Sequence, residues 1–163
     1  MSDDVQLSFR NADENDTEQL ATMSVQFYQE DPGGDPMTAD KVRRTAAELS
    51  AHPDKGRIII FSERGCTVGY GILIHFWSNE YGGDIIFIDE LYVIPEARNR
   101  GIATSFFHSV FLQYAGVAVA FQLEVTPRNS RAKDLYLRLG FRPAKNAFMF
   151  LRNGARQAPG ECG

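Results

Sequence analysis

The stretch "LYVIPEARNRGIATSFFHSVF", residues 91–111, joins an apolar strand to an amphipathic helix. Between its two halves lie Pro95, the polar run 98–100 and then Gly101. A helix N-terminus leaves its first backbone N–H groups unpaired and carries the positive end of the helix dipole. A turn that leads from a strand into such a terminus is a ready site for phosphate. A glycine in that turn lets an anion approach the main chain closely.

The turn therefore predicts a seat for a pyrophosphate group. Arg98 and Arg100 would add cations at its rim, Ala103 keeps the next position small, and Thr104 can add a hydroxyl. An ordinary helix start with solvated arginines remains an alternative for the turn alone. The stretch is neither a P-loop nor a dinucleotide fingerprint, because it lacks Gly-Lys-Ser/Thr and the glycine triplet.

Composition indicates one ordinary globular domain. The chain has 163 residues, of which 44% are apolar and 23% charged, and this length suits a single core. No run approaches the ~20 apolar residues of a membrane span or resembles a signal peptide. Cys66 and Cys162 lie too far apart in sequence to suggest a disulfide framework or a metal site. We therefore expect a cytoplasmic protein with no membrane partner and no metal.

The net charge of −4 argues against nucleic acid as a partner, because phosphate binding leaves a basic footprint. An acidic balance would suit a cationic small molecule, although it is also common on protein surfaces.

The hydrophobic periodicity predicts alternating elements. We expect strands at 5–12, 57–63, 67–77, 84–94, 117–125 and 146–152, and helices at 17–30, 38–51, 100–114 and 130–141. This order gives one mixed α/β domain over 5–152. The strands at 84–94 and 117–125 should be parallel neighbours, because a helix joins them. The Gly- and Pro-containing tail 153–163 is expected to be disordered.

A second polar block follows the strand at 117–125. Asn129 comes directly after that strand, and Tyr136 lies seven residues later on the next helix. If the two parallel strands diverge, a cleft opens between the turn at 98–103 and this block. A ligand with a pyrophosphate and an extended amide arm could pair with the exposed strand edge by β-addition.

These two blocks together resemble the GCN5-related N-acetyltransferase (GNAT) superfamily. Residues 98–103 fit its Arg/Gln-x-x-Gly-x-Gly/Ala pattern, and "NSRAKDLYLRLGF" at 129–141 is similar to its Asn…Tyr…Gly-Phe region. The element order matches over roughly 5–152. "IDELYV" at 88–93 also resembles the acidic strand of polyamine and small-amine acetyltransferases. The resemblance implies the family's acyl-CoA N-acyltransferase fold, a central mixed sheet with splayed parallel strands flanked by helices.

The resemblance implies acetyl-CoA as the acyl donor. Backbone N–H groups of residues 98–103 would bind its pyrophosphate, and Leu91 and Val93 would pair with its pantetheine arm. The Val93 N–H could also polarise the thioester carbonyl, and Asn129 would contact the pantetheine or phosphate region. The full set of expected cofactor contacts is Leu91, Tyr92, Val93, Arg98, Asn99, Arg100, Gly101, Ile102, Ala103, Thr104 and Asn129.

Acetyl transfer to an amine needs a base and an acid. Tyr136 is the candidate acid for the departing thiolate, because a phenol is protonated at neutral pH; a core aromatic is the alternative. Asp89 and Glu90 are the candidate bases, and they point to opposite faces because strand side chains alternate. Asp89 ranks first because it shares parity with Leu91 and Val93. A water molecule could relay the proton, or the carboxylate could only hold the substrate.

The acceptor pocket is expected from the front half of the domain. Tyr28 and the loop residues Trp77, Glu80 and Tyr81 are candidate walls, because aromatic rings with carboxylates suit a cation. The predicted function is N-acetylation of a primary amine on a small molecule. The alternatives are a protein N-terminal or lysine acetyltransferase and a non-catalytic CoA-binding sensor. A homodimer is possible.

Overall fold

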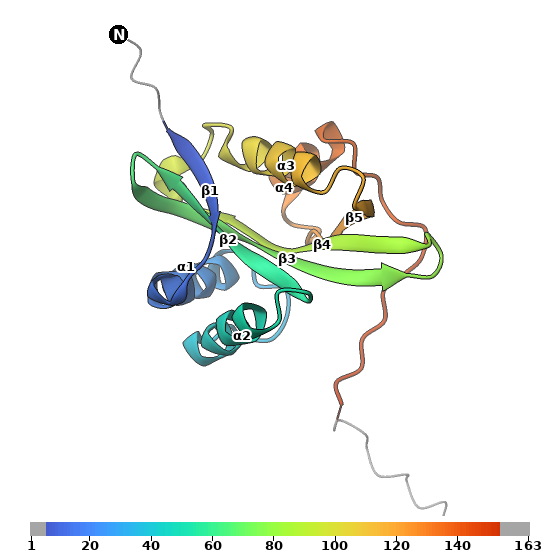
Figure 1. Cartoon of the computed structure of the whole chain (residues 1–163), viewed down its shortest axis with the longest axis horizontal. Helices are drawn as coiled ribbons and strands as arrows, with labels where there is room; N and C mark the ends of the chain where they lie inside the picture. Colours follow the sequence, from blue (N-terminus) through green and yellow to red (C-terminus); the bar gives the residue numbers. More distant parts are fainter. Residues whose placement is uncertain (1–5, 154–163) are drawn as a thin grey trace, which may run out of the picture.

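A five-stranded mixed sheet forms the middle layer of the computed structural model, which describes residues 6–153 (Figure 1). Its strands lie in sequence order and are β1 (Leu7–Asn11), β2 (Gly56–Glu63), β3 (Cys66–Ser78), β4 (Gly83–Val93) and β5 (Ala118–Leu123). Strands β1 to β4 are antiparallel neighbours, whereas β4 and β5 run parallel. The predicted mixed sheet, with parallel strands around one crossover helix, is confirmed.

Helices cover both faces of the sheet (Figure 1). On one side lie α1 (Thr17–Glu30) and α2 (Ala39–Ala51), and on the other lie α3 (Ile102–Gln113) and α4 (Ser130–Arg138). Two short 3-10 helices, η1 (Glu14–Asp16) and η2 (Pro95–Ala97), lead into α1 and toward α3.

Each face of the sheet has its own apolar core. Under α3, the fully buried rings of Phe61, Phe106 and Phe107 pack with the β4 residues Ile86 and Ile88. Under α1 and α2, the core is built from Leu20, Met23, Val42, Ile60, Tyr70, Ile72 and Tyr92. Burial of alternate strand residues on opposite faces is the pattern expected for a sheet covered on both sides.

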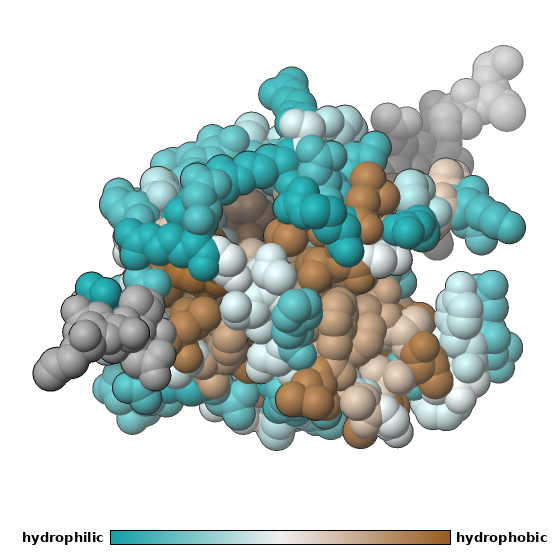
Figure 2. Space-filling view, turned by 90° about the horizontal axis from the view of Figure 1, so that it is seen from above, coloured by the Kyte–Doolittle hydropathy of each residue, from teal (hydrophilic) through white to brown (hydrophobic). Residues whose placement is uncertain are grey.

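The α3 and α4 side is not uniformly polar. Viewed from this side, apolar atoms reach the surface between hydrophilic residues (Figure 2). Leu112 on α3 and Leu137 on α4 are among the exposed apolar side chains.

The prediction of a strand at 146–152 is wrong, since these residues form no strand and are exposed. The sequence has a suitable apolar run, but a strand also needs a neighbour, and the segment runs away from the sheet (Figure 1). The expectation of a disordered tail at 153–163 falls, apart from Asn153, outside the described residues.

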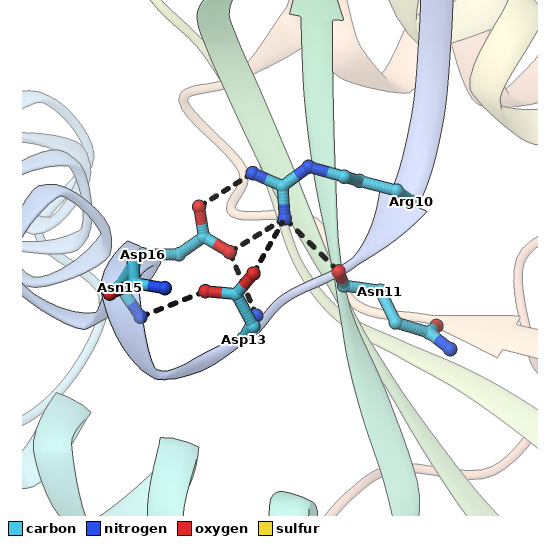
Figure 3. Close-up of polar contacts among 5 residues, drawn as sticks. All are labelled: Arg10, Asn11, Asp13, Asn15 and Asp16. Carbon is cyan, nitrogen blue, oxygen red and sulfur yellow. Dashed lines mark hydrogen bonds and ion pairs between the residues drawn. The ribbon is translucent and has the colours of Figure 1, made fainter.

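A polar cluster fixes the entry into α1 (Figure 3). Asp13 and Asp16 form a capping box around η1, in which the Asp13 N–H donates to Asp16 Oδ2 at 2.8 Å. Arg10 on β1 donates two hydrogen bonds of 2.7 Å to the Asp16 carboxylate. The Asp16 side chain is only 10% exposed. The hydrogen bonds from Arg10 hold the pKa of Asp16 below its usual value.

Asp16→Asn should lower the free energy of unfolding by about 1–2 kcal/mol at pH 7, because a neutral amide cannot keep the two charge-assisted hydrogen bonds from Arg10. Because the folded-state pKa of Asp16 is depressed, its stabilisation is present above the unfolded-state pKa and is lost as pH falls through the folded-state value. The difference in the free energy of unfolding between wild type and Asp16→Asn should therefore become smaller at acidic pH. Urea melts at several pH values measure this. Glu14→Gln, an exposed carboxylate of the same turn, is the control; equal effects of the two changes would contradict the assignment.

Candidate active site

The pairing of β4 with β5 stops short of the end of β4. The last pair is Ile88 with Leu123, although β4 continues to Val93. Ile94 donates its N–H to the Val68 carbonyl of β3 at 2.9 Å. Because hydrogen-bonding direction alternates along an antiparallel strand, Leu91 and Val93 turn their N–H and C=O groups toward the side that β5 has left. The two strands thus separate and leave an open edge between them.

A pocket of about 1180 Å³ lies at this separation. Its walls come from the end of β4, the turn into α3, the turn from β5 into α4, and the loop between α1 and α2. Ten of the eleven residues expected to contact the cofactor line it: Leu91, Tyr92, Val93, Arg98, Asn99, Gly101, Ile102, Ala103, Thr104 and Asn129. Arg100 does not.

The turn into α3 has the backbone geometry of an anion seat. Asn99 and Gly101 both adopt left-handed conformations, with φ of 64° and 76°. Gly101 is the N-cap residue, and no side chain caps this helix end. A Cβ added at Gly101 would meet no atom within 4 Å, so the space beside this residue is open, and residues 101–104 line the pocket. This geometry fits a phosphate group.

The two arginines of the turn are engaged within the protein, so the structure corrects their expected role as free rim cations. Arg98 donates to the Val93 carbonyl at 2.8 Å and to Glu30 at the end of α1 at 2.7 Å. Arg100 pairs with Glu63 on β2 at 2.6 Å. They hold the turn against the sheet and α1, and the N–H groups at the start of α3 have no capping side chain.

Asn129 also has a structural partner. Its Oδ1 accepts from the Ala132 N–H at 3.1 Å and caps α4. Its Nδ2 donates to Asp31 at 3.2 Å, and Thr126 donates to the same carboxylate at 2.7 Å. Asp31 follows α1, so these bonds connect the two walls of the pocket.

A β-bulge places Asp89 in the pocket. Ile72 pairs with Glu90 and Leu73 with Ile88, so Asp89 is the extra residue of β4. Ile86 and Ile88 before the bulge share the α3 face with Leu91 and Val93 after it, which simple alternation along the strand would not allow. Asp89 lines the pocket and Glu90 does not, so the two side chains differ in facing, as expected from alternation along the part of β4 that follows the bulge.

Asp89 faces a second carboxylate that the sequence reasoning missed. Glu124 lies just beyond β5 and lines the pocket with Asp89. Asp89 is open to solvent through the cleft, yet the cleft walls partly desolvate it. This desolvation, followed by the charge of Glu124, raises the pKa of Asp89. Neither carboxylate forms an ion pair within residues 6–153. In the sequence, the only sign of this second carboxylate was an acidic residue at the end of the strand predicted at 117–125.

Glu90, the second candidate base, lies on the α1 face and does not line the pocket. It is 6% exposed. Tyr70 donates to its Oε2 at 2.6 Å and Ser24 on α1 donates to the same atom at 3.3 Å. Burial raises the pKa of Glu90. This correction follows from the tertiary packing of α1, which closes over that face of β4.

Tyr136 on α4 lines the pocket, and its ring packs against Phe107 and Phe141. Burial, followed by the charge of Asp31, raises the pKa of Tyr136 to about 12. The phenol is therefore protonated at neutral pH and able to donate a proton.

Of the four expected acceptor residues, only Tyr28 lines the pocket. Trp77, Glu80 and Tyr81 lie at the tip of the β3–β4 hairpin, and the two rings are 67% and 59% exposed. The tip is roughly 20 Å from Asp89 at ~3.3 Å per strand residue. The correction has a simple cause: the cleft opens at the opposite end of β4.

Basic residues of the β5–α4 region were also missed. Arg128, Arg131 and Arg138 line the pocket on the α4 side, and Lys41 lines it from α2. Arg131 donates to the Asn99 side chain and so reaches the phosphate turn. The signal was "TPRNSR" at 126–131, in which the arginines flank the expected contact residue.

Residues 6–153 contain no cluster of three or more His, Cys, Asp or Glu suited to a metal ion. None of the helices described there has the length and apolar character needed to cross a membrane.

The fold and the cleft are those of one class of proteins: residues 18–141 match the acetyltransferase (GNAT) family, and the chain belongs to that family. Its curated relatives include thialysine N-epsilon-acetyltransferases, at 37% identity over 87 residues for the Sus scrofa protein and 38% over 80 residues for that of Bos taurus. The first alignment covers 50% of this chain and 48% of the relative. The chain thus matches about half the length of these relatives.

Solved structures share the fold over nearly the whole chain. A possible acetyltransferase from Clostridium difficile 630 has a TM-score of 0.78 at 20% identity, covering 90% of this chain and 97% of its own. An integron cassette protein from the mobile metagenome of Cole Harbour Salt Marsh has a TM-score of 0.75 at 29% identity, covering 91% of both chains. The aminoglycoside N-acetyltransferase AAC(6')-Iy, solved with CoA, has a TM-score of 0.73 at 16% identity, covering 94% and 99%.

Glu90→Gln should change the pH dependence of stability. Because the folded-state pKa of Glu90 is raised, the native protein loses stability from this group as pH rises from the unfolded-state value through the folded-state value. Glutamine does not titrate, so the variant should gain stability relative to wild type between about pH 4.5 and neutrality. Thermal melts across this range test the prediction. Glu14→Gln, at an exposed position, is the control; a constant difference in stability between wild type and Glu90→Gln across this range would show that Glu90 is not desolvated.

Proposed function

We propose that this protein transfers an acetyl group from acetyl-CoA to a primary amine of a small cationic molecule. One observation carries the proposal: the separation of β4 and β5 joins an open helix N-terminus and two carboxylates, which have no ion-pair partner among residues 6–153, in a single pocket. Relatives named for thialysine and aminoglycoside acetylation act on cationic amines, which supports this substrate class. Acceptance of a protein N-terminus or lysine, or cofactor sensing without turnover, are the alternatives.

Donor binding is assigned to backbone groups. When bound, acetyl-CoA supplies an acetyl thioester. The N–H groups at the start of α3, from Gly101 to Thr104, would hold its pyrophosphate, and Arg131 would add charge from the α4 side. Leu91 and Val93 would pair with the amides of the extended arm along the open edge of β4. The Val93 N–H would donate to the oxygen of the thioester carbonyl.

The acceptor must lose a proton before it attacks, because an ammonium has no lone pair. Asp89 and Glu124 would attract the ammonium, and Asp89 would take its proton directly or through water. The raised pKa of Asp89 strengthens it as a base. Tyr136 would give a proton to the departing sulfur. Tyr28 lines the same pocket and would form one wall for the acceptor.

The proposed compartment is the cytoplasm. Cys66 is an exposed, free thiol, which is compatible with a reducing environment.

Gly101→Glu should weaken acetyl-CoA binding at least tenfold, because the new side chain brings bulk and negative charge to the phosphate seat. Gly116→Glu is a matched control, since Gly116 has a similar φ of 73°, has equally open space and does not line the pocket. Calorimetric titration with acetyl-CoA and CoA measures the effect. Equal binding by the two variants would place the donor elsewhere, and no binding by the native protein would overturn the proposal.

Asp89→Asn should lower kcat/KM by about 10²–10⁴-fold with donor binding intact, the usual worth of a general base. Glu124→Gln removes a charge that raises the pKa of Asp89, so the acidic limb of the kcat/KM profile should move to lower pH. Thiol release with thialysine, polyamines and aminoglycosides gives the rates. Asp134→Asn, an exposed carboxylate of α4 outside the pocket, is the control. If the acidic limb of the kcat/KM profile of Glu124→Gln lies at the same pH as in the native protein, Glu124 does not influence the pKa of the base.

A further inference from the structure

The end of α1 reaches the pocket and is bonded to two of its walls. Glu30, the last residue of the helix, accepts a hydrogen bond of 2.7 Å from Arg98 in the turn into α3. Asp31, the next residue, accepts from the Thr126 hydroxyl at 2.7 Å and from Asn129 Nδ2 at 3.2 Å, both in the turn between β5 and α4. Two successive carboxylates therefore hold the two turns that border the cleft.

The sheet does not hold the turn between β5 and α4. Main-chain pairing of β5 with β4 ends at Leu123, and residues 124–129 continue without it. Within residues 6–153, the two side-chain hydrogen bonds that tie this turn to the end of α1 both end on the Asp31 carboxylate, one on each oxygen. Hydrogen bonds to a carboxylate are stronger than those between neutral groups. Asp31 is thus the point at which α1 fixes this turn.

The bonds of Asn129 determine which group its side chain can offer to a ligand. Its Oδ1 accepts from the Ala132 N–H at 3.1 Å and so caps α4. Its Nδ2 carries two hydrogens, and Asp31 accepts one of them. Turning the amide over would place Nδ2 against the Ala132 N–H and Oδ1 against the carboxylate, and both contacts would be repulsive. Because Asn129 lines the pocket, the group that remains for a ligand is an N–H donor.

We propose that Asp31 is a positioning residue for the acyl donor: it fixes the Asn129 amide so that the second Nδ2 hydrogen meets a carbonyl of the pantetheine arm. This inference rests on the proposed function. Asp31 acts through Asn129, and Thr126 holds the other carboxylate oxygen in place. Burial, followed by the charge of Asp31, raises the pKa of Tyr136 to about 12, so the same carboxylate also helps to keep the proposed acid protonated.

Calorimetric titration of the full chain with CoA tests the role of Asp31. Asp31→Ala should weaken CoA binding about tenfold, the effect of one lost hydrogen bond, while the circular dichroism spectrum stays native. Asp54→Asn, which alters an exposed carboxylate outside the pocket, is the control and should bind CoA as the native protein does. Native affinity in Asp31→Ala would overturn the inference.

A double-mutant cycle separates positioning through Asn129 from a general structural role. Asn129→Ser removes both amide hydrogens but keeps a side-chain oxygen that can cap α4. If Asp31 acts through Asn129, Asp31→Ala should weaken CoA binding in the native chain and add no further loss in a chain that already carries Asn129→Ser. An equal further loss in the Asn129→Ser chain would show that Asp31 acts by another route and would refute the inference.

Thr126 offers a matched pair of variants that leaves both Asp31 and Asn129 in place, and it decides the question if Asp31→Ala does not fold. Thr126→Ser keeps the hydroxyl that holds Asp31 and should bind CoA with native affinity. Thr126→Val removes the hydroxyl at nearly the same size and should bind CoA more weakly. Equal binding by the two variants would count against the positioning role.

Gly101→Glu distinguishes failure of this inference from failure of the proposed function. If the native protein does not bind CoA, the proposed function falls and the role of Asp31 falls with it. If the native protein binds CoA, Gly101→Glu does not, and Asp31→Ala binds as the native protein does, the donor site stands and only the inference about Asp31 is wrong.

Discussion

Hydrogen bonding between β4 and β5 ends at Ile88 and Leu123 while β4 runs on to Val93, and the site depends on this early end. Had the pairing continued, the outward N–H and C=O groups of Leu91 and Val93 would have formed hydrogen bonds with β5, and no cleft would have opened between the strands. The β-bulge at Asp89 coincides with the separation and turns that side chain toward the space it creates. The start of α3 lies at the same end of β4, so main-chain donors and the acidic residues border one pocket.

The charges around the pocket divide into those that build it and those that remain available. Arg98 and Arg100 have short ion pairs with Glu30 and Glu63, and these bonds hold the turn in its left-handed conformation at Asn99. Backbone N–H groups have a fixed direction once the turn is fixed, so a rigid turn presents these donors without further ordering. Arg98 and Arg100 thus brace the turn, and in the proposed function main-chain N–H groups hold the anion.

Asp89 and Glu90 show how environment separates two neighbouring carboxylates. Burial raises the pKa of both, but Glu90 is enclosed by hydroxyl donors under α1, whereas Asp89 opens into the pocket beside Glu124. Adjacent residues of the same chemistry therefore take different roles: Glu90 ties α1 to the sheet, and Asp89, in the proposed function, meets the cationic acceptor.

Local sequence determined the helices, the first five strands and the phosphate turn, because periodicity, capping residues and Gly101 are encoded within a few residues of each element. The family resemblance of 98–103 and 129–141 is confirmed, and it located ten of the lining residues. Tertiary structure decided the rest, because each depends on which distant segments meet. Helix α1 packs over Glu90, so this residue does not line the pocket. Glu124 lies near Asp89 because of the way the two strands separate. Trp77 lies far from the pocket, at the tip of the β3–β4 hairpin. The run at 146–152 has the composition of a strand, but a strand also needs a pairing partner, and this segment pairs with none within residues 6–153.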